Sequence, residues 1–327
     1  MWSDFSEEEI NNCEFFQLSD VFKRHNINRI VQKIDDFEIL NFINEGTYGN
    51  VYRVKRKDNN NICALKKIYY FNSDPNIVKS FMREVLILQE LLHPNVIKVN
   101  GYAQDMNDGS IYIEYPYYQE SLCDMMSKIC LEESKVKLYI YQLFDALSYI
   151  HSKKIIHRDI TPSNILISST DNIVLIDFNI SKKKDYNKID SDNYSPCLTT
   201  IRYKAPEVIL DVQDYNETID VWGAGCILYE LINKGNPLFD GEGNLEQLQK
   251  IFCVLGIPNE DTFPGFNNIQ FFKCFSVEIN EFKSIKDLLK ERIVDLSIFD
   301  LFYQIFTYNY KERISAEECK RHPYLER

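Results

Sequence analysis

The sequence lacks the cysteine and histidine spacings of a metal site or a disulfide framework. Its nine cysteines are scattered and odd in number, none is spaced as C-x-x-C, and the five histidines are equally dispersed. We therefore expect reduced thiols, as in the cytosol or the nucleus, and no metal cage built from these side chains.

Long apolar runs are also missing. No uncharged apolar run approaches the roughly 18 residues that a membrane helix needs, and the nearest candidate, residues 221–232, is interrupted by Glu230. The first nine residues are acidic, whereas a secretory signal peptide is basic and then apolar. The sequence predicts a soluble protein that is not secreted by that route.

Positive charge is scarce. The 37 Lys and Arg residues face 49 Asp and Glu residues, which gives a net charge of −12 at pH 7. Such a surplus of negative charge argues against a general affinity for nucleic acid or anionic lipid, so we expect neither as a partner. Any phosphate that the protein binds must be held by a few placed cations.

The composition is that of a folded chain, and the sequence pattern predicts an N-terminal extension. With 45% hydrophobic and 26% charged residues, 327 residues can bury a sizeable core in one large domain or two lobes. Residues 1–36 form the extension, in which apolar residues at positions 27, 30, 31 and 34 predict an amphipathic helix after Asp20.

The remainder of the chain predicts an α+β fold with two lobes. Short β-branched runs predict strands over residues 37–42, 50–56, 62–68, 96–101 and 111–115, and one helix interrupts them at 76–92. Helices dominate after residue 121, for example at 135–152, 218–233 and 244–255. We therefore expect a small β-rich lobe with one regulatory helix at residues 37–118 and a larger, mostly helical lobe at 119–327.

A glycine-containing turn and a lysine point to phosphate binding. Gly46 and Gly49 lie between strand-like segments, where the lack of a side chain lets the backbone approach a phosphate chain. Lys66 ends an apolar strand from which it can reach phosphate oxygens, and Glu84 on the predicted helix can fix its position. Taken singly, each feature also fits a plain hairpin turn or a solvated surface charge.

The most informative motif is the segment HRDITPSN at residues 157–164, followed by Asp177 after an apolar strand. The spacing of Asp159 and Asn164 is that of the catalytic loop H-R-D-x-x-x-x-N. Phosphoryl transfer needs a carboxylate that accepts the proton of the attacking hydroxyl, together with hard oxygen ligands for magnesium. We assign the first role to Asp159 and the second to Asn164 and Asp177, although a lone Asp after a strand is often only a turn former.

With these motifs the chain resembles eukaryotic serine/threonine protein kinases, and within them the cyclin-dependent kinase group, over residues 37–325. The matching segments are 45–49 (EGTYG), 64–68 (ALKKI), 92–97 (LHPNVI), 203–208 (YKAPEV), 220–225 (DVWGAG), 237–241 (PLFDG), 251–258 (IFCVLGIP), 307–315 (TYNYKERIS) and 322–324 (HPY). The resemblance implies ATP and Mg²⁺ as cofactors, transfer of the γ-phosphoryl group to protein Ser or Thr hydroxyls, and a role in cell-cycle or transcription control. It also implies a protein substrate, a cyclin or another kinase as a candidate partner, and a location in the nucleus or the cytoplasm.

The resemblance assigns further site residues. The catalytic positions are Asp159, Lys66, Glu84, Asn164 and Thr161, and the nucleotide-binding positions are Asn44, Glu45, Gly46, Gly49, Val51, Ala64, Lys66, Tyr115, Pro116, Tyr118 and Asp177. Tyr115 is expected to gate the back of the adenine pocket, with the hinge at residues 116–118. An ion pair between Glu207 and Arg313 is also implied.

Three positions in the phosphate-binding and catalytic motifs depart from the family pattern. Asn44 stands at the first glycine of the phosphate loop, and Asn179 stands at the glycine after Asp177 and Phe178. Asparagine is the residue besides glycine that best tolerates positive φ, so both changes are mild. Thr161 replaces a lysine that stabilises charge on the transferred group, and such a loss costs about 10²–10³ in rate. We therefore expect a slowed enzyme, with a pseudokinase scaffold that binds without transferring phosphate as the alternative.

The segment after Asp177 predicts regulation by phosphorylation. Ser195 precedes a proline and lies five residues before Thr200. In the resembling group, the position that Ser195 occupies carries the activating phosphothreonine. The cations that would bind a phosphate on Ser195 are Arg83, Arg158 and Lys182. Thr200 itself is expected to hydrogen-bond near Asp159 and to favour Ser or Thr acceptors. A plain loop serine at 195 is the alternative.

Dependence on a cyclin is less well supported by the sequence. Residues 78–84 keep only the final Arg-Glu of the group's cyclin-facing helix, and residues 115–117 and 200–207 resemble kinases that phosphorylate the activation loops of cyclin-dependent kinases. In such an enzyme residues 1–35 would brace the small lobe in place of a cyclin. Arg202 and Lys204 replace the group's tryptophan and arginine, which weakens the expectation of proline after the target residue.

Overall fold

A computed structural model describes residues 22, 31–46, 49–68, 75–183, 201–268, 282–289 and 295–326. The chain divides into two compact units. The first, here called the sheet unit, comprises residues 1–92, 96–119 and 178–180, and the second, the helical unit, comprises residues 93–95, 120–177 and 181–327. The predicted α+β class with a β-rich and a mostly helical lobe is confirmed.

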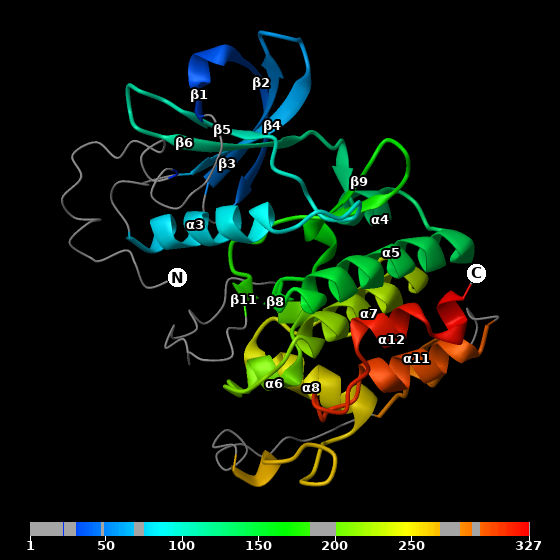
Figure 1. The fold of residues 1–327 in the computed structure, drawn as a ribbon. Coiled ribbons are helices and arrows are strands. Elements are labelled where there is room, and N and C mark those ends of the chain that lie inside the picture. Colours follow the sequence, from blue (N-terminus) through cyan, green and yellow to red (C-terminus); the bar gives the residue numbers. More distant parts are fainter. Residues whose placement is uncertain are drawn as a thin grey trace. The chain divides into compact units, whose positions relative to one another are not determined.

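The sheet unit is built on a six-stranded sheet with the order β1-β5-β6-β4-β3-β2. β1 pairs with β5 in parallel, and the other pairs are antiparallel. Figure 1 shows α3 alongside this sheet. The elements of the unit are β1 (Val31–Lys33), η1 (Ile34–Asp36), β2 (Phe37–Gly46), β3 (Gly49–Arg56), β4 (Ile62–Ile68), α3 (Pro75–Gln89), β5 (Gly101–Gln104) and β6 (Ile111–Pro116).

Alternating strand residues make the core of this unit. The cluster consists of Phe37, Val54, Cys63, Leu65, Ala103 and Tyr112, all buried. Each large apolar side chain contributes about 1.5–3 kcal/mol by burial. Glu114 is buried beside this core, and Arg56 compensates its charge with two hydrogen bonds of 3.0 and 2.7 Å to the carboxylate oxygens.

Two sequence predictions in the sheet unit are wrong. The helix expected after Asp20 is present at Phe22, but its predicted end is contradicted, because residues 31–33 form β1 and residues 34–36 form η1. The free edge of β5 offers backbone partners to Val31, Gln32 and Lys33, and this pairing overrides the helical spacing. The strand expected at 96–101 is displaced to 101–104, and the apolar residues before it are buried in an irregular segment.

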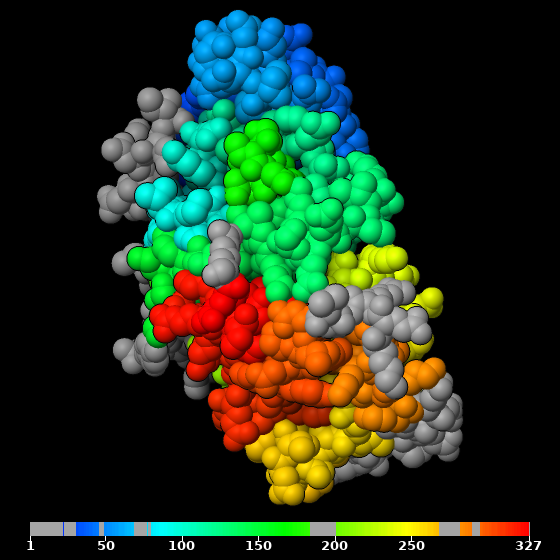
Figure 2. Space-filling view, turned by 90° about the vertical axis from the view of Figure 1, so that its right-hand side faces the viewer, coloured from blue at the N-terminus to red at the C-terminus, as the bar shows by residue number. Residues whose placement is uncertain are grey.

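The helical unit is organised around α7, which is buried along almost its whole length. α5 packs against both α7 and α12, and Figure 2 shows η5 and α12 (red) at the surface next to α11 (orange). The elements are β7 (Glu120–Ser121), α4 (Leu122–Lys128), α5 (Glu133–Ser152), β8 (Ile155–Ile156), η2 (Pro162–Asn164), β9 (Ile165–Ile167), β10 (Ile173–Leu175), β11 (Lys182–Lys183), η3 (Ile201–Tyr203), α6 (Pro206–Ile209), α7 (Thr218–Ile232), α8 (Asn244–Leu255), η4 (Phe266–Asn268), α10 (Ile285–Leu289), α11 (Ser297–Ile305), α12 (Ala316–Lys320) and η5 (Pro323–Leu325).

Two glycines let α7 approach its neighbours closely. A Cβ atom on Gly223 would lie 3.0 Å from the Cβ of Ile160, and one on Gly225 would overlap the side chain of Ile305. The first contact brings α7 against the segment that carries Asp159. Although α7 is apolar, none of the helices within the described residues has the length and hydropathy needed to cross a membrane.

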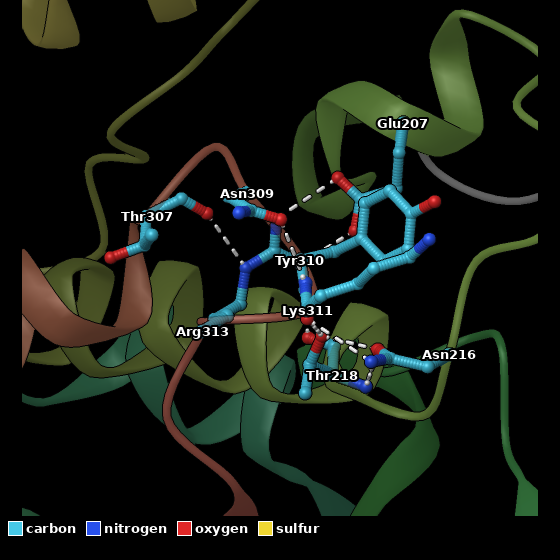
Figure 3. Close-up of polar contacts among 8 residues, drawn as sticks. All are labelled: Glu207, Asn216, Thr218, Thr307, Asn309, Tyr310, Lys311 and Arg313. Carbon is cyan, nitrogen blue, oxygen red and sulfur yellow. Dashed lines mark hydrogen bonds and ion pairs between the residues drawn. The ribbon is translucent and has the colours of Figure 1, made fainter. Parts of the chain in front are cut away.

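A buried ion pair ties α6 to the segment after α11 (Figure 3). Arg313 donates from Nη1 to Glu207 Oε1 at 2.6 Å and from Nη2 to Oε2 at 3.0 Å, and both side chains are fully buried. Two further N–H groups of Arg313 donate to the carbonyls of Thr307 and Thr218, and the guanidinium lies 5.0 Å from the centre of the Trp222 ring. The pair expected from the resemblance is confirmed.

Candidate active site

The glycine turn closes the β2-β3 hairpin. Gly46 pairs with Gly49 and Asn44 pairs with Val51, while Thr47 and Tyr48 at the tip lie outside the described residues. A Cβ atom on Gly49 would overlap the carbonyl oxygen of Lys67, so only glycine fits there. Asn44 does not adopt a positive φ, which explains why a residue other than glycine is accepted at this position.

Lys66 and Glu84 form the predicted pair inside the sheet unit. Lys66 Nζ lies 2.8 and 3.1 Å from the two oxygens of Glu84, whose side chain is 3% exposed. Tyr115 adds a contact that sequence reasoning missed, because its hydroxyl donates to Glu84 Oε1 at 2.7 Å. The carboxylate is therefore held from two sides, and the ammonium of Lys66 is held in one place.

The other predicted nucleotide-binding residues of the sheet unit lie on adjoining strands. Val51 pairs with Lys66, and Ala64 pairs with Tyr115. Pro116 ends β6, and Tyr118 follows it in a half-buried position that raises the pKa of its phenol. Asn44 and Glu45 are exposed at the end of the hairpin. The pairing thus gathers Val51, Ala64 and Tyr115 around the strand that carries Lys66.

The loop that carries Asp159 is fixed by Asp220 at the start of α7. The buried Asp220 carboxylate accepts hydrogen bonds of 2.8 Å from the backbone N–H groups of His157 and Arg158. Arg158 has φ +72, a conformation that costs energy and is compensated by these bonds. The sequence contained this Asp in the 220–225 motif, but its role became apparent only from the fold.

His157 connects this loop to the strand before Asp177. Its Nδ1 accepts from the backbone N–H of Asp159 at 3.2 Å, so the ring proton lies on Nε2, which donates to the carbonyl of Ile176 at 2.8 Å. The histidine therefore acts as a buried spacer between two chain segments that both carry acidic residues of the site.

One carboxylate oxygen of Asp159 accepts a hydrogen bond, and the other accepts none from the described residues. Asn164 Nδ2 donates to Asp159 Oδ2 at 2.7 Å, whereas Oδ1 is buried and accepts no hydrogen bond from any described residue. Burial raises the pKa of the Asp159 carboxyl, and Asp177 adds to this rise, while His157, Asn164 and Lys204 oppose it. Oδ1 is thus a fixed acceptor, the group that a general base requires.

Asn164 and Asp177 can hold a magnesium ion. The Ile176 N–H donates to the carbonyl of Asn164 at 2.9 Å, which places the residue after it, Asp177, near Asn164. Because the Asn164 amide nitrogen faces Asp159, its amide oxygen faces away from Asp159. The described residues contain no group of three or more His, Cys, Asp or Glu arranged for a metal. A magnesium ion held by one or two protein oxygens and by nucleotide phosphates needs no such group, so the donor set fits.

The two remaining departures from the family pattern differ in consequence. Asn179 uses its backbone carbonyl, which accepts from Ser80 Oγ at 3.0 Å and from Arg83 Nη1 at 3.4 Å, and its φ is not positive. The side chain at 179 is therefore not critical for this turn. Thr161 is buried before η2 and carries no charge, so the site lacks a lysine at that position.

The predicted phosphate-binding cations fall in both units. In the helical unit β11 pairs with β8, with Lys182 opposite Ile156, so Lys182 lies near Arg158. Arg83 belongs to the sheet unit, where it donates to Asn179. Ser195 and Thr200 lie outside the described residues, and their roles stay predictions.

A buried carboxyl in α7, that of Glu230, predicts that stability depends on pH. Burial raises the pKa of Glu230, although the hydroxyl of Tyr203 donates to it at 2.6 Å. A raised pKa in the fold means that charging Glu230 disfavours the folded state, and this cost grows as pH rises from the ordinary carboxyl pKa through the folded value. We expect the free energy of unfolding of Glu230→Gln to exceed that of the wild type at pH 8, and the difference to vanish towards pH 4. Unfolding in urea at both pH values measures it. A stability difference that does not change with pH would contradict the assignment.

Known proteins are similar to this chain in sequence. The protein kinase domain family matches residues 37–325. A probable cyclin-dependent kinase 10 from Dictyostelium discoideum is 32% identical over 299 residues, which cover 90% of this chain and 80% of that protein. Cyclin-dependent kinase G-1 of Oryza sativa subsp. indica is 33% identical, and cyclin-dependent kinase 14 of Mus musculus is 34% identical.

The matches differ in how much of each relative they cover. The chain spans 43% of the length of the rice protein and 62% of that of the mouse protein, while 90% of this chain is matched in both cases. The family match covers most of the chain and contains every site residue assigned above. The chain therefore belongs to the protein kinase family, in its cyclin-dependent kinase-like serine/threonine group, whose members are transferases.

Proposed function

We propose that this protein transfers the γ-phosphoryl group of ATP to Ser or Thr hydroxyls of a protein substrate, with magnesium as the cofactor. The observation that supports this most directly is the geometry of Asp159, which is held by Asn164 through Oδ2 and keeps a buried Oδ1 that accepts no hydrogen bond from the described residues. A scaffold that only binds would not need a carboxylate oriented in this way. Family membership and the Lys66–Glu84 pair support the same function.

Each retained residue has a defined task in this reaction. Lys66, positioned by Glu84, neutralises charge on the nucleotide phosphates, and Asn164 and Asp177 bind the metal through oxygen. Bound Mg²⁺ supplies charge stabilisation for the transferred group. Asp159 Oδ1 orients the acceptor hydroxyl and takes its proton.

The missing positive charge at position 161 predicts a gain of function. Thr161→Lys would place a cation two residues after Asp159, and we expect kcat to rise by about 10² because one electrostatic donor at the transferred group is typically worth that much. Thr161→Ser, which keeps the hydroxyl and adds no charge, should leave kcat unchanged. Equal rates for both variants in a steady-state kinase assay would show that the charge is supplied elsewhere in the chain.

The type of substrate and partner is a second part of the proposal. The relatives are named as cyclin-dependent kinases, so a role in cell-cycle or transcription control, a location in the nucleus or cytoplasm, and a cyclin or another kinase as partner are proposed for this chain. An activator of cyclin-dependent kinases that works without a cyclin is the second candidate. Arg202 and Lys204 stand where this group has tryptophan and arginine. This difference favours the activator over a kinase that requires proline after the target residue.

The test is transfer of label from γ-³²P-ATP by the purified chain. We expect Mg²⁺-dependent labelling of serine and threonine in a general protein substrate, abolished by EDTA and by Lys66→Met. Labelling of a cyclin-dependent kinase activation-loop peptide without added cyclin would select the second candidate, and labelling of proline-directed peptides would select the first. If the wild type labels the substrate no more than Lys66→Met does, the proposed kinase function is wrong, and a scaffold that binds without transferring phosphate is favoured.

A further inference from the structure

We propose that Phe22 and Tyr115 are positioning residues that hold α3 from within this chain, so that the Lys66–Glu84 pair forms without a partner subunit. The inference rests on the proposed function, because it concerns how the Lys66 side of the site is kept in place. All residues involved belong to the sheet unit.

The first contact is a column of three aromatic rings that begins in the N-terminal extension. The ring of Phe22 meets the ring of Tyr102 edge to face with 4.7 Å between centroids, and Tyr102 meets Phe81 of α3 edge to face at 6.4 Å. The exposed fractions of the three residues are 1%, 0% and 2%. Edge-to-face pairs at these separations are attractive and directional, so Phe22 restrains the place of Phe81 through Tyr102.

The backbone of the extension is anchored at the same point. Val31 of β1 is the strand partner of Tyr102, and Gln32 and Lys33 continue the parallel pairing along β5. The extension therefore reaches Tyr102 twice, once through the backbone register and once through the Phe22 ring. A short parallel strand at a sheet edge adds little stability alone, but it fixes residues 31–33 beside β5.

The aromatic column reaches α3 close to the residue that matters for Lys66. Phe81 and Glu84 are three residues apart in one helix, so their side chains lie on neighbouring positions of its surface. Tyr115 holds Glu84 directly through the hydroxyl bond of 2.7 Å. Ser80 and Arg83 of the same helix donate to the carbonyl of Asn179.

These contacts constrain α3 on more than one side. The packing of Phe81 restrains the helix against the sheet, and the Tyr115 hydroxyl aligns the carboxylate that binds Lys66 Nζ. If either contact is lost, α3 can shift and Glu84 can leave Lys66, which would weaken the hold on nucleotide phosphate. A helix held by its own chain in this way does not require a second protein for the pair to form.

The experiment compares Phe22→Ala and Tyr115→Phe with the wild type in the full chain, without added partner. We expect kcat/KM for ATP to fall about tenfold in each variant, a size typical of coupled contacts, while Phe22→Leu, which keeps an apolar side chain, recovers most of the rate. Hydrogen exchange of residues 75–89 should be about tenfold faster in Phe22→Ala. The matched control is Phe42→Ala, an aromatic residue of the same unit that is 52% exposed and should change neither quantity.

The exchange measurement separates this inference from the proposed function. If residues 75–89 exchange faster in Phe22→Ala but the wild type transfers no phosphate, the proposed kinase function is wrong. The proposal that Phe22 helps to hold α3 is then still supported. If neither hydrogen exchange nor the rate changes in Phe22→Ala and Tyr115→Phe, these residues do not hold α3. The proposed kinase function is not affected by that result. If Phe22→Ala does not fold, Tyr115→Phe, which removes only the hydroxyl that binds Glu84, gives both the rate and the exchange readout. A wild-type rate that rises more than tenfold on adding a cyclin would also overturn the claim that no partner is needed.

Discussion

Replacing Arg313 with alanine should destabilise the protein by about 3–5 kcal/mol, the cost of leaving a buried carboxylate without its partner. Glu207 is fully buried and has both oxygens bound by the Arg313 guanidinium. The change also removes hydrogen bonds to two backbone carbonyls and the packing of the guanidinium near the ring of Trp222. Unfolding in urea, followed by circular dichroism, measures the loss.

Two controls test whether the ion pair is the cause. Arg313→Lys keeps the charge but not the planar fork with its two parallel bonds, so most of the loss should remain. Lys311→Ala removes an exposed cation that pairs with Asp214 on the surface, and it should change stability by less than about 1 kcal/mol. A small effect of Arg313→Ala, similar to that of Lys311→Ala, would show that the buried pair does not hold this region together.

Replacing Asp159 with asparagine should lower kcat by about 10²–10⁴, the usual contribution of a positioned general base. Asparagine has nearly the same shape, and its amide oxygen can still accept from Asn164 Nδ2. It cannot take a proton from the acceptor hydroxyl. KM for ATP should stay within about twofold, because a change confined to the transition state leaves substrate binding in place.

The stability of this variant is an internal control. Burial raises the pKa of the Asp159 carboxyl, which means that the fold disfavours its charged form. The neutral amide removes that cost, so we expect Asp159→Asn to be as stable as the wild type or more stable. A loss of activity accompanied by a loss of stability would assign Asp159 a structural role instead.

The sequence predicted those parts of the fold in which the local pattern and the tertiary environment agree. β4 and α8 have the bounds that their apolar patterns predict, and α5 and α7 differ from prediction by only a few residues at their ends. The pattern failed where another segment decided the outcome. Residues 31–33 became a strand because β5 offered a free edge. Leu92, the last residue of the helix predicted at 76–92, lies beyond the end of α3 and is 81% exposed.

The candidate site shows the same division. Motif spacing was enough to single out Lys66, Glu84, Asp159 and Asn164. The structure pairs Lys66 with Glu84 as predicted and adds a hydrogen bond from Asn164 to Asp159 that was not predicted. The bond from Tyr115 to Glu84 joins residues 31 positions apart, and no local pattern signals it. The clamp of Asp220 on the backbone of residues 157 and 158 likewise depends on the close approach of α7, which its glycines allow.

The proposed kinase activity depends on Asp159. It is tested most directly by the initial rate of ³²P transfer from ATP to protein serine and threonine, measured for the wild type and Asp159→Asn at saturating ATP and Mg²⁺. We predict measurable transfer by the wild type and a rate lower by at least about 10² in the variant. Equal rates in the two proteins would contradict the account.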